Sequence, residues 1–201
     1  MDANSRRNRR HRIARAIAAG LLASAVAACQ ATGTTTPPEF PVVSLREVLP
    51  ALQQEAREWR GDAYLSWVEI PLKEHPSGGA VAYAAYQTLG EEDESLLVTL
   101  QPDNSASSEK IPHEVPVIQV EPIVLDHSIL DSGEALGRAL ELAGTGTSSM
   151  LRSGCSFLML ERLRGADVRP IIWRLVLREC LTPAAEQIRI DARTGELVNY
   201  P

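Results

Sequence analysis

The sequence predicts an α+β protein in which a helix packs on a small antiparallel β-sheet, a unit that we expect to occur twice. Two segments have apolar residues at helical spacing, and each begins with Ser or Asp followed three residues later by Glu. Three strand-like runs separated by turn residues follow each helical segment. A basic, then apolar, then polar stretch precedes the first helix and does not belong to this pattern.

The chain begins with the features of a signal peptide. Six arginines between Arg6 and Arg15 form a basic head, and residues 16–28 are an uncharged apolar run. This run is too short to cross a hydrocarbon layer of about 30 Å as a helix. The residues Val26-Ala27-Ala28-Cys29 resemble the lipobox of bacterial lipoproteins. The resemblance implies cleavage between Ala28 and Cys29, a diacylglycerol on the Cys29 sulfur and an acyl chain such as palmitate on the new amino terminus.

The lipid anchor also indicates a location and a partner. Several acyl chains, at about 0.8 kcal/mol per buried methylene, would hold the chain to a membrane almost permanently. In the lipoprotein family an Asp after the cysteine favours the inner membrane, and this chain has Gln30. We therefore expect the periplasmic face of the outer membrane, in preference to the inner membrane or the cell surface. An ordinary secretory signal that contains a cysteine, or an uncleaved anchor, are the alternatives.

Net charge argues against nucleic acid as a partner. The whole chain has 20 basic and 26 acidic residues, a net charge of −6. Removal of residues 1–28 takes away six of the basic residues and one of the acidic ones, and the net charge becomes −11. A surface of this charge is repelled by phosphate backbones.

We divide the chain into five segments. Residues 1–28 are the signal peptide, 29–42 the lipidated cysteine with a flexible Thr- and Pro-rich tether, 43–104 the first α+β unit, 105–130 a connector and 131–201 the second α+β unit.

In the first unit, Ser44 and Glu47 form a capping-box pattern that starts a helix, and Gly61 is a suitable stop. Residues 103–110 are predicted to be a polar loop, and the proline-interrupted residues 115–125 an edge strand or an extended connector. The three predicted strands are Tyr64–Ile70, Ala80–Thr88 and Ser95–Gln101.

In the second unit, Asp131 and Glu134 repeat the capping box and Gly144 ends the helix. The predicted strands are Cys155–Leu163, Ile171–Glu179 and Glu186–Asp191. A shift of about 90 residues relates the two units: it places Trp67 on Phe157, Tyr83 on Trp173, Val98 on Ile188 and Leu100 on Ile190. The alternative is that an α+β chain shows two such cycles without a repeat.

Cysteine count and strand register predict a disulfide. With Cys29 lipidated, Cys155 and Cys180 remain in an oxidising compartment. If the two strands form an antiparallel hairpin, matching their apolar faces opposes Leu158 with Leu177 and Leu160 with Leu175. The same register opposes Glu161 with Arg174 and Cys155 with Cys180, within disulfide reach. Two free, buried thiols are the alternative.

The last 30 residues resemble a known family. Asp191 can cap a turn with its carboxylate, and Gly195 can take the positive φ that a tight reversal needs. A strand with Trp173 near its start, followed by a strand that closes in Asp191-Ala-Arg-Thr194-Gly195-Glu, is similar to the end of the PepSY-type domain of bacterial envelope proteins. The resemblance covers roughly residues 131–200, and the expected repeat would make two such domains in tandem. It implies a helix-on-sheet fold that binds or restrains other envelope proteins, and it carries no catalytic residues.

No catalytic, metal or cofactor site is predicted. His75, His113 and His127 are expected in solvated loops without metal-ligand spacing, and the acidic groups Glu91–Glu94 and Asp62/Glu69 lack the pattern of a calcium loop. The segment Ser153-Gly154-Cys155-Ser156 offers a nucleophile but no paired base. We therefore expect a lipid-anchored binding or inhibitory module for another envelope protein, for which a peptidase is one candidate. An envelope hydrolase with an unrecognised site, or a structural role in outer-membrane or cell-wall assembly, are the alternatives.

Overall fold

A computed structural model describes residues 42–72, 79–88, 94–112, 121–144, 150–151, 154–163, 170–180 and 185–199. They form two helices and one seven-stranded antiparallel sheet, which confirms the α+β class. The helices are α2 (Leu45–Trp59) and α3 (Ser132–Ala143). The strands are β1 (Tyr64–Leu72), β2 (Ala82–Gln87), β3 (Glu94–Leu100), β4 (Ala106–Pro112), β5 (Ser156–Arg162), β6 (Ile171–Arg178) and β7 (Ala185–Asp191).

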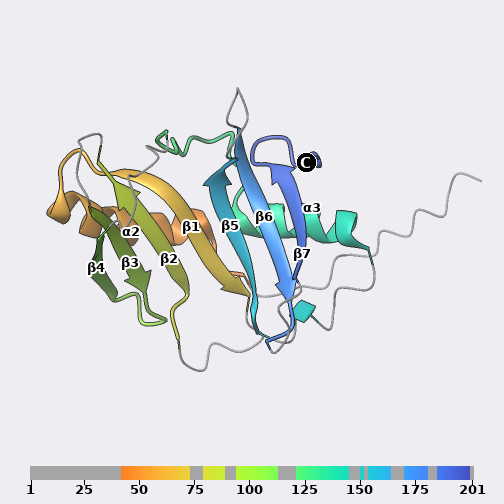
Figure 1. Cartoon of the computed structure of the whole chain (residues 1–201), viewed down its shortest axis with the longest axis horizontal. Coiled ribbons are helices and arrows are strands. Elements are labelled where there is room, and N and C mark those ends of the chain that lie inside the picture. Colours follow the sequence, from red (N-terminus) through yellow and green to blue (C-terminus); the bar gives the residue numbers. More distant parts are fainter. Residues whose placement is uncertain are drawn as a thin grey trace, which may run out of the picture. The chain divides into compact units, whose positions relative to one another are not determined.

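The sheet has the strand order β4-β3-β2-β1-β5-β6-β7, so that β1 and β5 join the two halves at its centre. Directly opposed residues of neighbouring strands share a face. Val68 opposes both Ala84 and Leu160, and all three are completely buried in one core with both helices. Helix α2 contacts β2, β3 and β4, and α3 contacts β6 and β7. Both helices therefore cover the same face of the sheet, and Figure 1 shows them behind the strands.

The helices begin and end as their sequences predict. The Ser44 hydroxyl accepts a hydrogen bond from the Glu47 N–H at 3.3 Å, and the Asp131 N–H donates to the Glu134 carboxylate at 3.0 Å. Helix α3 ends at Gly144, which has a φ of 77°. Each helix also presents an apolar stripe to the core, which explains why both segments pack on the sheet.

The two helix N-termini are joined by side chains of α3. The buried Ser132 hydroxyl accepts from the Leu45 N–H at 2.9 Å and donates to the Val43 carbonyl at 2.6 Å. The Asp131 carboxylate accepts from the Arg46 N–H at 3.1 Å. The N–H groups at the start of a helix need hydrogen-bond acceptors. For α2, residues from the other half of the chain supply these acceptors.

The predicted polar loop at 103–110 is wrong, because residues 106–112 form the edge strand β4 paired with β3. Its side chains are almost all exposed, so no apolar alternation marks it as a strand. The repeated αβββ unit is not confirmed. Strand β4 has no counterpart in the described part of the second half, and the proposed equivalents Tyr83 and Trp173 lie on opposite faces. Tyr83 opposes Glu69 on the face opposite α2 and α3, whereas Trp173 is in the core.

The predicted register of the β5–β6 hairpin is wrong by two residues. Leu158 opposes Leu175, and Leu160 opposes Trp173. A shift of two keeps every side chain on its predicted face, so the apolar pattern alone does not distinguish the two registers.

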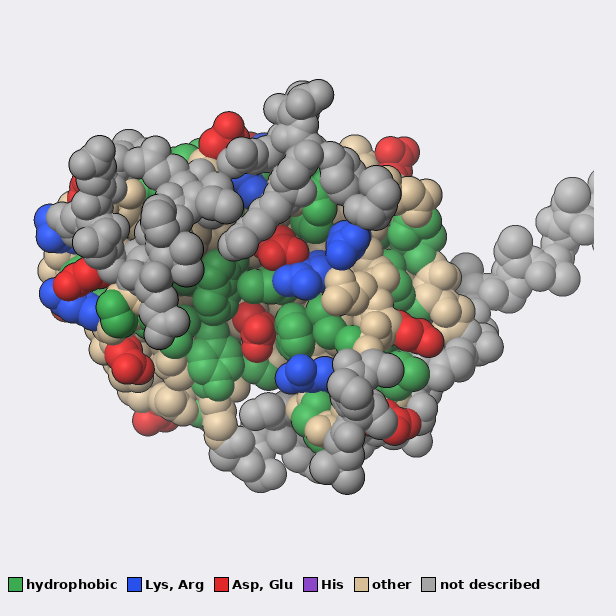
Figure 2. All heavy atoms as spheres, viewed as in Figure 1, with side chains coloured by type: hydrophobic (Ala, Val, Ile, Leu, Met, Phe, Trp, Pro, Cys, Tyr) green, Lys and Arg blue, Asp and Glu red, His purple; other side chains and the backbone are tan. Residues whose placement is uncertain are grey.

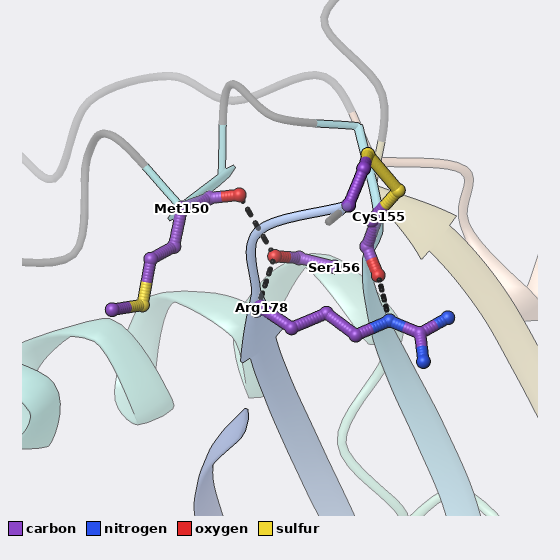
Figure 3. Close-up of a disulfide and its surroundings, with 5 residues drawn as sticks. Met150, Cys155, Ser156 and Arg178 are labelled. Carbon is purple, nitrogen blue, oxygen red and sulfur yellow. Dashed lines mark hydrogen bonds between the residues drawn. A yellow bond between two sulfur atoms is a disulfide. The ribbon is translucent and has the colours of Figure 1, made fainter. Parts of the chain in front are cut away.

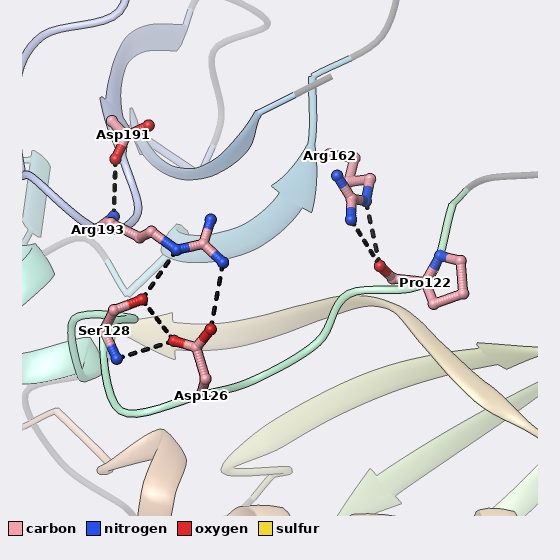
Figure 4. A network of polar contacts seen from close by, with 6 residues as sticks. All are labelled: Pro122, Asp126, Ser128, Arg162, Asp191 and Arg193. Atoms are coloured by element: carbon pink, nitrogen blue, oxygen red, sulfur yellow. Dashed lines mark hydrogen bonds and ion pairs between the residues drawn. The ribbon is translucent and has the colours of Figure 1, made fainter. Parts of the chain in front are cut away.

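The turn after β7 confirms the local prediction for Asp191 and Gly195. The Asp191 carboxylate accepts from the N–H groups of Arg193 and Thr194 at 2.8 and 2.9 Å, and Gly195 has a φ of 72°. Figure 4 shows how the Arg193 side chain of this turn reaches Ser128 and Asp126 of the segment before α3. The same segment is held farther along by Arg162, which donates to the Pro122 carbonyl at 2.8 Å. The turn and Arg162 thus fix the approach to α3 on the sheet.

Candidate binding face

The side of the sheet opposite α2 and α3, which we call the open face, carries side chains of all seven strands. One row of directly opposed residues crosses it completely; from β4 to β7 it contains Ser107, Thr99, Tyr83, Glu69, Met159, Arg174 and Arg189. Figure 2 shows this face, on which hydrophobic side chains lie beside a group of acidic and basic ones. The exposed face of an antiparallel sheet is usually polar, so large apolar side chains here are notable.

Four large side chains gather on the three central strands of the open face. Trp67 projects from β1, Tyr83 from β2, and Phe157 and Met159 from β5, and we call this group the apolar centre. All four are half-buried, although neither α2 nor α3 covers them. Because water contacts part of each side chain, the group can lose further apolar surface when another molecule binds.

Glu69 lies in the middle of the apolar centre. It directly opposes Tyr83 on one side and Met159 on the other, and Trp67 is its neighbour along β1. Its carboxylate makes no hydrogen bond or ion pair within the described part of the chain. Burial raises the pKa of Glu69, and the positive charges of Arg178 and Arg174 oppose that rise. The described cations thus offset only part of the electrostatic cost of ionised Glu69.

Charged side chains occupy the β5–β6 side of the open face. The Arg174 guanidinium forms an ion pair with the Glu161 carboxylate at 2.7 Å and contacts the Met159 sulfur at 2.9 Å. Glu161 and Arg174 are thus in contact as predicted, but diagonally, since Glu161 directly opposes Ile172. This pair keeps the Arg174 guanidinium beside Glu161 rather than Glu69.

A disulfide holds one end of this region. Cys155 and Cys180 are bonded, with their Cα atoms 5.2 Å apart, which confirms the predicted pairing. Next to it, the Ser156 hydroxyl donates to the Met150 carbonyl at 2.9 Å and accepts from the Arg178 N–H at 3.2 Å (Figure 3). The Arg178 side chain donates to the Cys155 carbonyl at 2.9 Å and lies over the Phe157 ring, 5.6 Å from its centre. The disulfide and Ser156 therefore position Arg178 at the rim of the apolar centre.

The other predicted site residues are distributed as follows. Ala28, Cys29, His75, His113 and residues 91–93 lie outside the described residues. His127 is exposed in a turn, and Asp62 is in the turn before β1, away from the middle of that strand where Glu69 lies. Trp173 is completely buried and donates to the Leu130 carbonyl at 3.0 Å, which is a structural role.

The nucleophile considered at Cys155 is excluded because its sulfur is in the disulfide. Over the described ranges, no group of three or more His, Cys, Asp or Glu side chains is arranged to hold a metal ion. In the same part of the chain, no helix has the length and apolarity to span a membrane. A scan against protein-family models finds no match, and comparisons with curated proteins and with solved structures find none either.

Sequence reasoning missed the open face as a site. It predicted the Glu161–Arg174 pair but did not place Trp67, Tyr83 and Glu69 on the same face. The usable signal was the alternation of β1, in which Trp67 and Glu69 alternate with the core residues Val68 and Ile70. A tryptophan on the face opposite the core residues is a reason to look for a partner.

Proposed function

We propose that this chain is a lipid-anchored protein of the bacterial envelope that binds another envelope protein through the open face of its sheet. The observation that carries the binding proposal is the apolar centre, formed by Trp67, Tyr83, Phe157 and Met159 on the face opposite α2 and α3. Aromatic side chains that are partly exposed, with charged residues around them, are typical of protein-binding surfaces. The PepSY-like end of the chain supports the same class, in which inhibition of a peptidase is one form of binding.

The proposed location depends on the amino-terminal residues. The lipobox-like Val26–Cys29 supports the lipid anchor, and Gln30 supports the outer membrane. The Cys155–Cys180 disulfide is compatible with this location, because disulfides persist in the oxidising periplasm and are rare in the cytosol.

Site-specific photo-crosslinking in the host cell tests the binding proposal. A photoreactive amino acid at Thr99, on the open face beside Tyr83, should form a reproducible adduct with one envelope protein. The same amino acid at Glu58, exposed on α2, is the control and should give no such adduct. Adducts from Glu58 but none from Thr99 would move the binding surface to the helices and refute the proposal.

Labelled palmitate tests the anchor separately. Replacing Cys29 with serine removes the acceptor sulfur, so Cys29→Ser should abolish incorporation of the label and leave unprocessed precursor. Labelling of the serine variant, or a wild-type chain without acyl groups, would refute the lipoprotein proposal and leave the binding proposal intact.

A further inference from the structure

We infer that the partner presents a lysine or arginine side chain to the open face, where it packs against Trp67 and Tyr83 and pairs with the Glu69 carboxylate. This inference rests on the proposed binding function and names the chemistry of the partner. It makes Glu69 the residue that determines which partner is bound.

The surroundings of Glu69 match a cationic group better than a neutral one. Its direct neighbours on the face are Trp67, Tyr83 and Met159, and none of them donates a hydrogen bond to the carboxylate. A half-buried carboxylate among apolar groups is costly unless a cation or donor reaches it. Aromatic rings also attract cations through their faces, and Trp and Tyr do so most strongly. A basic side chain would therefore gain both contacts at one position.

The two described cations that act on Glu69 make their contacts with other groups. Arg174 is 2.7 Å from Glu161, and Arg178 donates to the Cys155 carbonyl and lies over Phe157. Both act on Glu69 only through longer-range electrostatic attraction, which offsets part of the cost of its burial. The position beside Glu69 thus lacks a contacting cation within the described part of the chain.

A protein side chain fits this site better than a metal ion. Glu69 is a single carboxylate, whereas hard cations require six or more oxygen ligands. The apolar centre extends over the adjacent strands β2, β1 and β5, which are about 4.8 Å apart and together span about 10 Å. This width suits a basic side chain together with apolar neighbours from the same partner surface. The acidic net charge of the chain favours the approach of such a partner.

The test repeats the crosslinking from Thr99 in two backgrounds of the full-length chain. Glu69→Gln keeps the shape of the side chain and removes its charge. Glu58→Gln makes the same change at an exposed position of α2, on the other side of the sheet, and is the matched control. We expect the adduct to decrease at least about tenfold with Glu69→Gln and to stay within about twofold with Glu58→Gln. The crosslinked partner peptide should contain a lysine or arginine.

The outcomes separate the inference from the proposed function. Equal adduct yields in wild type and Glu69→Gln, or loss with both variants, would overturn the role of Glu69 while the binding face stands. A partner peptide without a basic residue would also overturn it. No adduct from Thr99 in the wild type would refute the proposed function and this inference with it. Thermal unfolding of Glu69→Gln, expected to be at least as stable as wild type, excludes misfolding as the cause of a loss.

Discussion

Substitution of Ser132 by alanine tests how the two halves of the fold are joined. The Ser132 side chain is completely buried, and its hydroxyl satisfies the Leu45 N–H and the Val43 carbonyl. Ser132→Ala leaves both groups without that partner, and Leu45 is itself only 3% exposed. A buried polar group that loses its hydrogen bond costs about 1–3 kcal/mol. With two such groups, one of them partly accessible to water, we expect a loss of about 2–4 kcal/mol in the free energy of unfolding.

Urea unfolding followed by tryptophan fluorescence measures this loss. The matched control is Ser44→Ala, which removes the half-exposed N-cap of the same helix and should cost about 1 kcal/mol. If the slope of the unfolding free energy against urea concentration is the same for wild type and both variants, their unfolded states are comparable. A loss for Ser132→Ala no larger than that for Ser44→Ala would refute the conclusion that α3 caps α2.

Three further perturbations have expected signs. Replacing both Cys155 and Cys180 with serine should lower the free energy of unfolding by about 3 kcal/mol, because the disulfide closes a loop of 25 residues. A reductant should have no further effect on this double variant, and a further loss of stability with reductant would contradict the prediction. Gly195→Ala should cost about 1–2 kcal/mol in the same urea measurement, because the φ of Gly195 is 72° and a Cβ would lie 3.3 Å from Leu130. Gly137→Ala, in the middle of α3 where a Cβ meets no other atom within 4 Å, should instead stabilise the fold by about 0.5–1 kcal/mol. Glu69→Gln should raise the free energy of unfolding by up to about 1 kcal/mol at pH 7, and should not raise it below about pH 4. The reason is that a raised pKa means that ionisation of Glu69 opposes folding, and this penalty disappears when the carboxyl group is protonated. An equal gain at both pH values would exclude the charge as the cause.

The β5–β6 hairpin shows how far sequence reasoning reaches. It identified the Cys155–Cys180 bridge and the Glu161–Arg174 contact from a register that is wrong by two residues. Glu161 and Arg174 are diagonal neighbours in the true register, and side chains of that length reach across the diagonal of a twisted sheet. The cysteines lie just beyond the paired residues, and the disulfide joins them there although the ladder itself does not oppose them. Contact pairs could thus be predicted while the ladder could not.

Strand β4 marks the limit set by local patterns. Its residues 107–110 are polar and exposed on both faces, so no apolar alternation distinguishes them from a loop, and Ile111 is the one β-branched residue of the strand. Backbone hydrogen bonds to β3, supplemented by the Lys110–Glu94 ion pair at 3.4 Å, pair the strand at the edge of the sheet. Charged side chains at such an edge also discourage pairing with another chain.

The candidate site depends on long-range pairing that a single sequence does not contain. The alternation of β1 places Trp67 and Glu69 on the face opposite the core, which a sequence can indicate. Their neighbours Tyr83 and Met159 come from β2 and β5, and the pairing of β1 with β5 crosses more than 80 residues of chain. Because a slip of one residue would send these side chains to the other face, the site appears only once the register is known.

Hydroxyl-radical footprinting in intact cells tests most directly the claim that a partner covers the open face. Oxidation of Trp67, Tyr83 and Met159 would be measured by mass spectrometry in cells and in the purified chain, with Leu142 on α3, which is 48% exposed, as the internal reference. The proposed function predicts that the three open-face residues are protected several-fold in cells while Leu142 is oxidised equally in both samples. Equal oxidation of all four residues in cells and in the purified chain would contradict the claim.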